Sequence, residues 1–391
     1  MIVEPRKPVA SFVISARNEM PNVVHTIHSI LNDCEASNIP CEIILSDNGS
    51  TDNTTQFFTY ARSNNTLSHL EISRRGMVFN GTLKCVFDPI MGNVAARHNA
   101  VKYATGKYLF FSDAHLSVKP GSIAKMIKAV DESGGIVHPV IEWMGAFPGV
   151  GGYQYSLKIG EKFWGTWNRL AVSQDSWFYI PMSGHCFMAM DREQYVKFGG
   201  YNNYFRVYGG GEPYLDLKWW RMGSSVACVP NAMVYHLSAG RGYSYHYDDL
   251  IHNMSLAAYT VGGIKWAERI LIAYLDKPGA DHDIVWKLYN EALEEGKPDF
   301  DYINSQSQFT FEELIYHKGE CDGVKCKRGR KPPMPHPMSI WDVKNEERFG
   351  RHLSAMVIFE SWMEKLTNPE AIKIFSESPY QKVETPKFNL R

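Results

Sequence analysis

The first half of the chain alternates between short apolar runs and amphipathic stretches with helical spacing, and this pattern strongly constrains the fold. Apolar runs of strand length are each followed by a helix-like segment. Such alternation predicts an α/β fold, in which a mainly parallel sheet carries helices on both faces. The predicted strands cover 9–15, 42–47, 108–112 and 135–140, and the predicted helices begin at Pro21 and Asp52 and cover 93–105 and 120–132.

Polar clusters follow three of these predicted strands. They are Ser15-Ala-Arg-Asn-Glu19, Asp47-Asn-Gly-Ser-Thr-Asp52 and Ser112-Asp-Ala-His115. Ligands of such sheets bind beyond the carboxyl ends of the strands, so we expect the clusters to converge on one cleft. Each cluster alone is also compatible with a turn or a helix N-cap, because Asn, Gly, Ser and Asp are common there. Turns do not explain why the clusters recur at one edge of the sheet, whereas a shared nucleotide site does.

Asp113 and His115 lie one residue apart at a predicted strand end and are candidate ligands of one divalent cation. Carboxylate and imidazole accept several divalent ions, and an adjacent diphosphate would favour a hard octahedral ion such as Mn²⁺ or Mg²⁺. His236, at the end of a later predicted strand, is the candidate third ligand. Taken alone, the Asp-x-His pattern is weak evidence for a metal site and is more typical of a strand-end turn with a capping Asp.

The second half of the chain is less regular. Glycines and aromatic residues accumulate over 145–184, which indicates loops over the cleft. Beyond residue 245 the pattern is mainly helical, so we expect a domain at 1–245 and a helical extension at 246–391. Further predicted elements are strands at 186–191, 226–229 and 233–236, a helix at 211–222, a buried amphipathic helix at 250–275 and another at 345–366.

Several features predict a soluble cytoplasmic protein without membrane insertion. The N-terminus lacks the apolar length of a signal peptide. Charges at Lys265, Glu268 and Arg269 interrupt the longest apolar stretch, so it does not resemble a membrane span. The seven scattered cysteines are more typical of reduced thiols than of a disulfide framework. A formal net charge of -1 gives no overall attraction to nucleic acid, although a local basic patch could supply it.

The polar clusters at the ends of the predicted strands make the N-terminal part similar to the GT-A glycosyltransferases. It is similar to the widespread family whose strands end in an Asn-Glu pair and an Asp-Asp-Gly-Ser-Thr-Asp turn, with Asn48 here in place of the second Asp. The resemblance implies a nucleotide-sugar donor, specifically a UDP-sugar. It also implies contacts to the donor base from Ser15, Arg17, Glu19, Asp47 and Arg97.

Later segments resemble the polypeptide N-acetylgalactosaminyltransferases, and the ordered set is more specific than any one member. That family uses Asp-Ser-His as its metal motif, where this chain has Asp-Ala-His. The resemblance implies a retaining, metal-dependent transferase in which Asp113, His115 and His236 hold the cation. The matching segments are Asp113–His115, Ser183–Arg192, Phe198–Tyr201, Tyr208–Trp220 and Val229–His236.

Glu212 and the preceding Gly210 and Gly211 lie where related enzymes hold the sugar hydroxyls, so the resemblance makes Glu212 a catalytic candidate and both glycines donor-binding candidates. Alternatively, Glu212 is a favourable carboxylate at a helix N-terminus, and the glycines form a flexible turn. Trp219 and Trp220 are predicted to be core residues. The chain departs from the family at Arg241, which lies further from the metal His than the family's Arg, and it lacks the lectin module.

The acceptor does not follow from the resemblance. A hydroxymethylated base in bacteriophage DNA, a protein Ser or Thr, and a surface saccharide all compete. The run from Lys325 to Lys331, with five cations in seven residues, is typical of a solvated linker but could also contact phosphates. Together with the missing signal anchor and the replaced lectin module, it favours DNA. A phage protein would then act in the host cytoplasm. A catalytically inactive binding module is the alternative, and the intact metal motif argues against it. A zinc site at His317, Cys321, Cys326 and His336 has no standard spacing, so a solvated loop is favoured.

Overall fold

The chain forms two compact units. In the computed structural model the first unit lies within 1–155, 167–203 and 224–245, and the second within 156–166, 204–223 and 246–391. The predicted division into 1–245 and 246–391 remains a prediction. The structure describes residues 7–55, 81–88, 92–145, 154–159, 163–168, 176–238, 244–307, 310–311, 314, 357–359 and 366–377.

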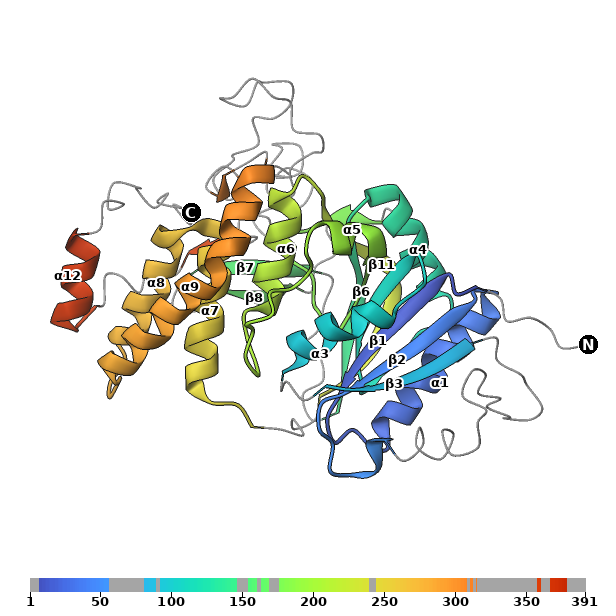
Figure 1. Cartoon of the computed structure of the whole chain (residues 1–391). Helices are drawn as coiled ribbons and strands as arrows, with labels where there is room; N and C mark the ends of the chain where they lie inside the picture. Colours follow the sequence, from blue (N-terminus) through green and yellow to red (C-terminus); the bar gives the residue numbers. More distant parts are fainter. Residues whose placement is uncertain are drawn as a thin grey trace, which may run out of the picture. The chain divides into compact units, whose positions relative to one another are not determined.

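The first unit is built on a nine-stranded mixed sheet, with helices packed against it (Figure 1). Its strands are β1 (Ala10–Ala16), β2 (Cys41–Asp47), β3 (Gly81–Phe87), β4 (Tyr108–Asp113), β5 (Leu116–Val118), β6 (Ile136–Gly145), β9 (Phe178–Tyr179), β10 (Phe187–Asp191) and β11 (Val226–Ser238). Its helices are α1 (Asn22–Ala36), α3 (Asn93–Ala100), α4 (Ser122–Ser133), α5 (Arg192–Lys197) and the 3₁₀ turns η1 (Asn53–Thr55) and η2 (Val101–Tyr103).

The strand order is β3-β2-β1-β4-β10-β6-β11-β5, with β9 paired to β11. Strands β1 to β4 pair in parallel, as do β6 and β11, whereas β10, β5 and β9 pair antiparallel to their neighbours. The predicted α/β class is therefore confirmed, with a mixed sheet in which the parallel part carries the polar clusters.

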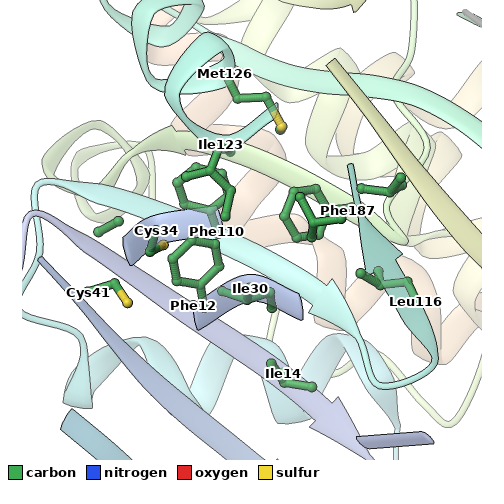
Figure 2. Packing of buried hydrophobic residues seen from close by; sticks show 14 of the residues in the cluster. Phe12, Ile14, Ile30, Cys34, Cys41, Phe110, Leu116, Ile123, Met126 and Phe187 are labelled. Atoms are coloured by element: carbon green, nitrogen blue, oxygen red, sulfur yellow. The ribbon is translucent and has the colours of Figure 1, made fainter. Parts of the chain in front are cut away.

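Alternating side chains of the central strands form the core on one face of the sheet, beneath α1 and α4. Phe12 and Phe110 stack with ring centroids 4.4 Å apart, and Phe187 lies 5.8 Å from Phe110 (Figure 2). Ile30 of α1 and Ile123 of α4 belong to the same buried cluster. This packing fixes the register of the strands, since a slip by one residue would turn every apolar side chain to the other face.

A buried carboxylate joins α1 to the beginning of α4. The side chain of Asp33 accepts hydrogen bonds from the backbone N–H groups of Gly121 and of Ile123, the latter at 2.9 Å. Asp33 is 3% exposed, and it satisfies donors that α4 itself leaves unpaired. Helix α4 then ends at Gly134, whose φ of 68° suits glycine.

The second unit is mainly helical, with a small separate sheet. Two helices replace the single one predicted over 250–275, because Gly263 adopts a φ of 83° and interrupts the helix. No helix among the described residues is long and apolar enough to cross a membrane. The elements are α6 (Gly211–Arg221), α7 (Tyr247–Gly262), α8 (Ile264–Leu275), α9 (His282–Gln306), α12 (Pro369–Glu377), β12 (Val357–Phe359) and the greater part of β7 (Gln154–Ile159) and of β8 (Trp164–Asn168).

Three further expectations were wrong in part. The predicted loops over 145–184 contain β7, β8 and β9. Within the predicted helix 345–366, residues Val357–Phe359 form a strand parallel to β7, consistent with the strand preference of two β-branched residues and a Phe. Apart from Leu366, the remainder of that range lies outside the described residues. The predicted strands at 226–229 and 233–236 are one strand, β11, with a register shift between Val229 and Met233, where Pro230 cannot donate to the ladder.

Candidate metal and nucleotide site

The polar clusters meet at one edge of the sheet because β1, β2 and β4 run in parallel and end together. Ala16 lies opposite Asp47, and Ser15 lies opposite Asp113. The backbone N–H of Asn18 donates to Ser50 Oγ at 3.0 Å, which ties the first cluster to the second, and the N–H of Glu19 donates to Thr54 Oγ1 at 2.7 Å. The predicted convergence of these segments is present in the structure.

Asp113, His115 and His236 come together at this edge although the sequence separates His236 from the other two. One potential ligand atom from each lies within 4.8 Å of the others. Asp113 ends β4, and its N–H donates to the carbonyl of Cys186 at 2.8 Å. In the antiparallel pairing of β5 with β11, His236 lies opposite Leu116, which is the residue that follows His115 in the sequence.

Asp113 lies between two basic side chains. Its Oδ1 accepts from Arg97 Nη2 at 2.6 Å, and its Oδ2 lies 3.0 Å from His236 Nε2. Burial disfavours the charged carboxylate, but the hydrogen bond with His236 and the charge of Arg97 outweigh it, so the pKa of Asp113 lies well below its usual value. Asp113 is therefore ionised at neutral pH, as a metal ligand must be.

His115 has a carboxylate partner of its own. Its Nδ1 lies 3.0 Å from Glu19 Oε1. Burial lowers the pKa of the imidazole, but the hydrogen bond to Glu19 and the charge of Asp113 raise it more, and the net shift is upward. The rings of His115 and His236 meet edge to face, with centroids 4.8 Å apart.

These side chains fit a hard divalent cation. One carboxylate and two imidazoles form a mixed oxygen and nitrogen donor set, which suits Mn²⁺ and leaves positions for further oxygen ligands. Arg97 contacts Oδ1 of Asp113, and the second oxygen, Oδ2, contacts His236. In the described part of the chain, His236 Nδ1 is buried without a hydrogen-bond partner.

Sequence reasoning did not identify Trp143. Its ring packs edge-on against His236, with centroids 4.6 Å apart. The two residues are opposite each other in the pairing of β6 with β11. No local motif marks Trp143, since its role depends on a strand pairing between distant segments.

The remaining predicted residues occupy varied positions. Ser15 is on β1 beside Asp113, and Arg17 Nη1 donates to the carbonyl of Asn48 at 3.4 Å. Asp47 is buried and accepts from the N–H of Ser50 at 3.2 Å.

In the second unit, Gly210 has a φ of 74°, and a Cβ there would approach the Asn253 carbonyl oxygen within 2.5 Å. Gly211 begins α6, and Glu212 lies in its first turn. Trp219 and Trp220 are buried, which confirms the core prediction. The segments that contain Arg241, the basic run and the four possible zinc ligands lie outside the described residues.

Asn48 departs from the family's Asp and makes two opposed hydrogen bonds. Its Oδ1 accepts from the N–H of Gly92 at 2.7 Å, and its Nδ2 donates to the carbonyl of Asp88 at 3.3 Å. Only an amide can do both, because an ionised carboxylate has no hydrogen to donate. Asn48 thereby joins the end of β2 to Asp88, which follows β3, and to Gly92, which precedes α3.

Asn48→Asp is therefore expected to destabilise the protein, although it restores the family's residue. It would replace the donated bond with repulsion between a carboxylate and the carbonyl of Asp88, at a cost of about 1–3 kcal/mol. Urea unfolding monitored by far-UV circular dichroism measures the change. Asn99→Asp is a less suitable control because Asn99 contacts Asp88 as well, so the exposed Asn203→Asp serves instead. Equal stability of Asn48→Asp and wild type would contradict this account.

Comparison with known proteins agrees with this geometry. Residues 11–195 match the model of "Glycosyl transferase family 2". A putative polypeptide N-acetylgalactosaminyltransferase 13 of Drosophila melanogaster is 24% identical over 38% of this chain and 28% of its own length. Polypeptide N-acetylgalactosaminyltransferase 9 of Macaca fascicularis is 24% identical over 70% of this chain and 46% of its own. The chain thus spans less than half the length of these relatives.

One solved structure supports the fold. The crystal structure of GalNAc-T7 with UDP, GalNAc and Mn²⁺ superposes with a TM-score of 0.56 at 17% identity. The superposition covers 78% of this chain and 58% of that one. The predicted resemblance to the GT-A glycosyltransferases is confirmed by this fold and by the match to the family 2 model.

Proposed function

We propose that this chain is a metal-dependent glycosyltransferase that moves a sugar from a UDP-sugar to a hydroxyl acceptor. One observation carries the proposal: Asp113, His115 and His236 meet at the carboxyl edge of a sheet whose N-terminal part matches the family 2 model. The similar GalNAc-T7 structure holds UDP and Mn²⁺, which supports the same ligands here.

The mechanism follows from the charge that develops as the sugar–phosphate bond breaks. A bound Mn²⁺ or Mg²⁺ would stabilise the negative charge on the departing diphosphate. Asp113, His115 and His236 would hold this cation, while Arg97 keeps the Asp113 carboxylate ionised and oriented. Retention of configuration is proposed from the family resemblance.

The donor is proposed to contact further residues outside this cluster. Ser15, Arg17 and Asp47 lie at the ends of β1 and β2, where the uridine would bind. We propose that the sugar hydroxyls of the donor contact the backbone at Gly210 and Gly211 and the carboxylate of Glu212. Glu212 would thereby act in catalysis by fixing the sugar in its reactive orientation.

Two acceptors are supported by different features. The names of the similar polypeptide N-acetylgalactosaminyltransferases favour a polypeptide, so a Ser or Thr hydroxyl is one proposed acceptor. The cationic run from Lys325 to Lys331 favours a hydroxymethylated base in phage DNA, which would be flipped out of the helix to react. The expectations of a surface saccharide acceptor and of a cytoplasmic location stay predictions.

A transfer assay with labelled UDP-sugars distinguishes these acceptors. With Mn²⁺ present, label should move to a Ser/Thr peptide or to hydroxymethylated duplex DNA. DNA transfer should weaken steeply with salt, with a logarithmic slope of about -0.9 per neutralised phosphate. Charge reversal over Lys325 to Lys331 should flatten that slope and leave transfer to the peptide unchanged. Transfer to the peptide alone, at every salt concentration, would eliminate the DNA acceptor.

A further inference from the structure

Glu19 occupies a position that differs from the one its sequence motif implies. The motif suggests a contact with the donor base, yet the Glu19 carboxylate lies 3.0 Å from Nδ1 of His115. Its side chain is 16% exposed, and that of His115 is 25% exposed. Most of the Glu19 side chain is thus enclosed beside the imidazole.

The backbone around Glu19 is held by hydrogen bonds with the second polar cluster and with Thr54, which follows that cluster. The N–H of Glu19 donates to Thr54 Oγ1 at 2.7 Å, and the N–H of Met20 donates to Asp52 Oδ2 at 3.1 Å. Asn18 adopts a positive φ of 56°, and its Oδ1 accepts from the N–H of Thr51 at 2.7 Å. This turn therefore presents the Glu19 carboxylate in one direction, toward His115.

An imidazole that binds a metal through one nitrogen commonly donates its other N–H to a carboxylate. That hydrogen bond fixes the tautomer and the ring orientation and makes the ligand nitrogen more basic. With Nδ1–H of His115 directed to Glu19, its Nε2 is the nitrogen left for the cation. His236 differs, because its Nδ1 is buried without a partner among the described residues.

We infer that Glu19 is a positioning residue of the metal site, which orients His115 for coordination through Nε2, and not a contact of the donor base. This inference rests on the proposed function, since it assumes that Asp113, His115 and His236 bind the cation. If the inference holds, Glu19 affects the Mn²⁺ affinity of the chain even when no nucleotide is bound.

The test is Mn²⁺ binding to the full chain without nucleotide, measured from the electron paramagnetic resonance signal of free Mn²⁺. Glu19→Ala should weaken Mn²⁺ binding by about 10–100-fold, the usual effect of losing such a partner. Glu19→Gln retains an oxygen that accepts from Nδ1–H, so it should recover part of that loss. Glu142→Ala, an exposed carboxylate of the same sheet, is the matched control and should bind Mn²⁺ like wild type.

Base selectivity provides a second, independent measurement. At saturating Mn²⁺, the ratio of UDP to CDP affinity should be the same in Glu19→Ala and wild type. Wild-type Mn²⁺ affinity in Glu19→Ala, together with a changed UDP to CDP ratio, would overturn the inference and restore the base contact. If the wild-type chain binds no Mn²⁺, or has the same Mn²⁺ affinity as Asp113→Asn, the proposed metal site itself is wrong. That result is distinct from a failure of the Glu19 inference alone, in which wild type binds Mn²⁺ more tightly than Asp113→Asn and Glu19→Ala matches wild type.

Discussion

Asp113→Asn is expected to reduce metal-dependent release of UDP from the donor by about 1000-fold or more. The amide keeps the shape of the side chain but loses the negative charge that a divalent cation requires. Metal stabilisation of a departing phosphate is worth several kcal/mol, and about 4 kcal/mol corresponds to a factor of about 1000 in rate. Initial rates at saturating Mn²⁺ and donor measure the effect.

The same substitution also removes the ionised partner of Arg97. The Arg97 side chain is only 2% exposed, and breaking a buried ion pair costs about 3–5 kcal/mol. Thermal unfolding must therefore show that Asp113→Asn is folded at the assay temperature. Asp131→Asn is the matched control, because Asp131 is 47% exposed in a surface ion pair with Lys107 and should leave activity unchanged. A folded Asp113→Asn protein with wild-type activity would refute the metal assignment.

Phe110→Ala is expected to lower the free energy of unfolding by about 3–5 kcal/mol. Phe110 is fully buried between Phe12 and Phe187, and its removal leaves a cavity that the surrounding sheet and helices cannot fill. Chemical denaturation measures the change. Phe87 provides a control of the same residue type in the same sheet, because it is 66% exposed.

Phe87→Ala should change the stability by less than about 0.5 kcal/mol, as is usual for surface positions. Equal destabilisation by the two substitutions would show that the stack of Phe12, Phe110 and Phe187 is not the centre of the core. A loss at Phe110 alone would confirm that burial in this stack determines the cost.

Local patterns predicted most of the parallel part of the sheet but missed β3, which pairs in parallel with β2. The alternation of apolar runs and helical stretches correctly indicated β1, β2, β4, α1 and α4, because each has the periodicity of its own element. The small strands β7, β8 and β12 were missed, since their pairing depends on partners far along the chain. The break at Gly263 was missed because a glycine inside an apolar stretch does not by itself reveal its φ.

The sequence motifs predicted the three candidate metal ligands but not the residues that contact them. Asp113 and His115 stand in one motif, and His236 was the candidate third ligand because it ends a later predicted strand. The structure brings the three together. The partners of these residues could not be read from spacing. Glu19 precedes His115 by 96 residues, and the pairing of Trp143 with His236 requires knowledge of the strand order.

Release of UDP from a panel of UDP-sugars, measured with Mn²⁺ and with excess chelator, tests the central claim most directly. The wild-type chain should release UDP from at least one donor in Mn²⁺, and chelation should abolish that release. Asp113→Asn should remain inactive under both conditions, whereas Asp131→Asn should follow wild type. Release that is equally fast in excess chelator, or no release from any UDP-sugar with Mn²⁺ and acceptor present, would contradict a metal-dependent glycosyltransferase.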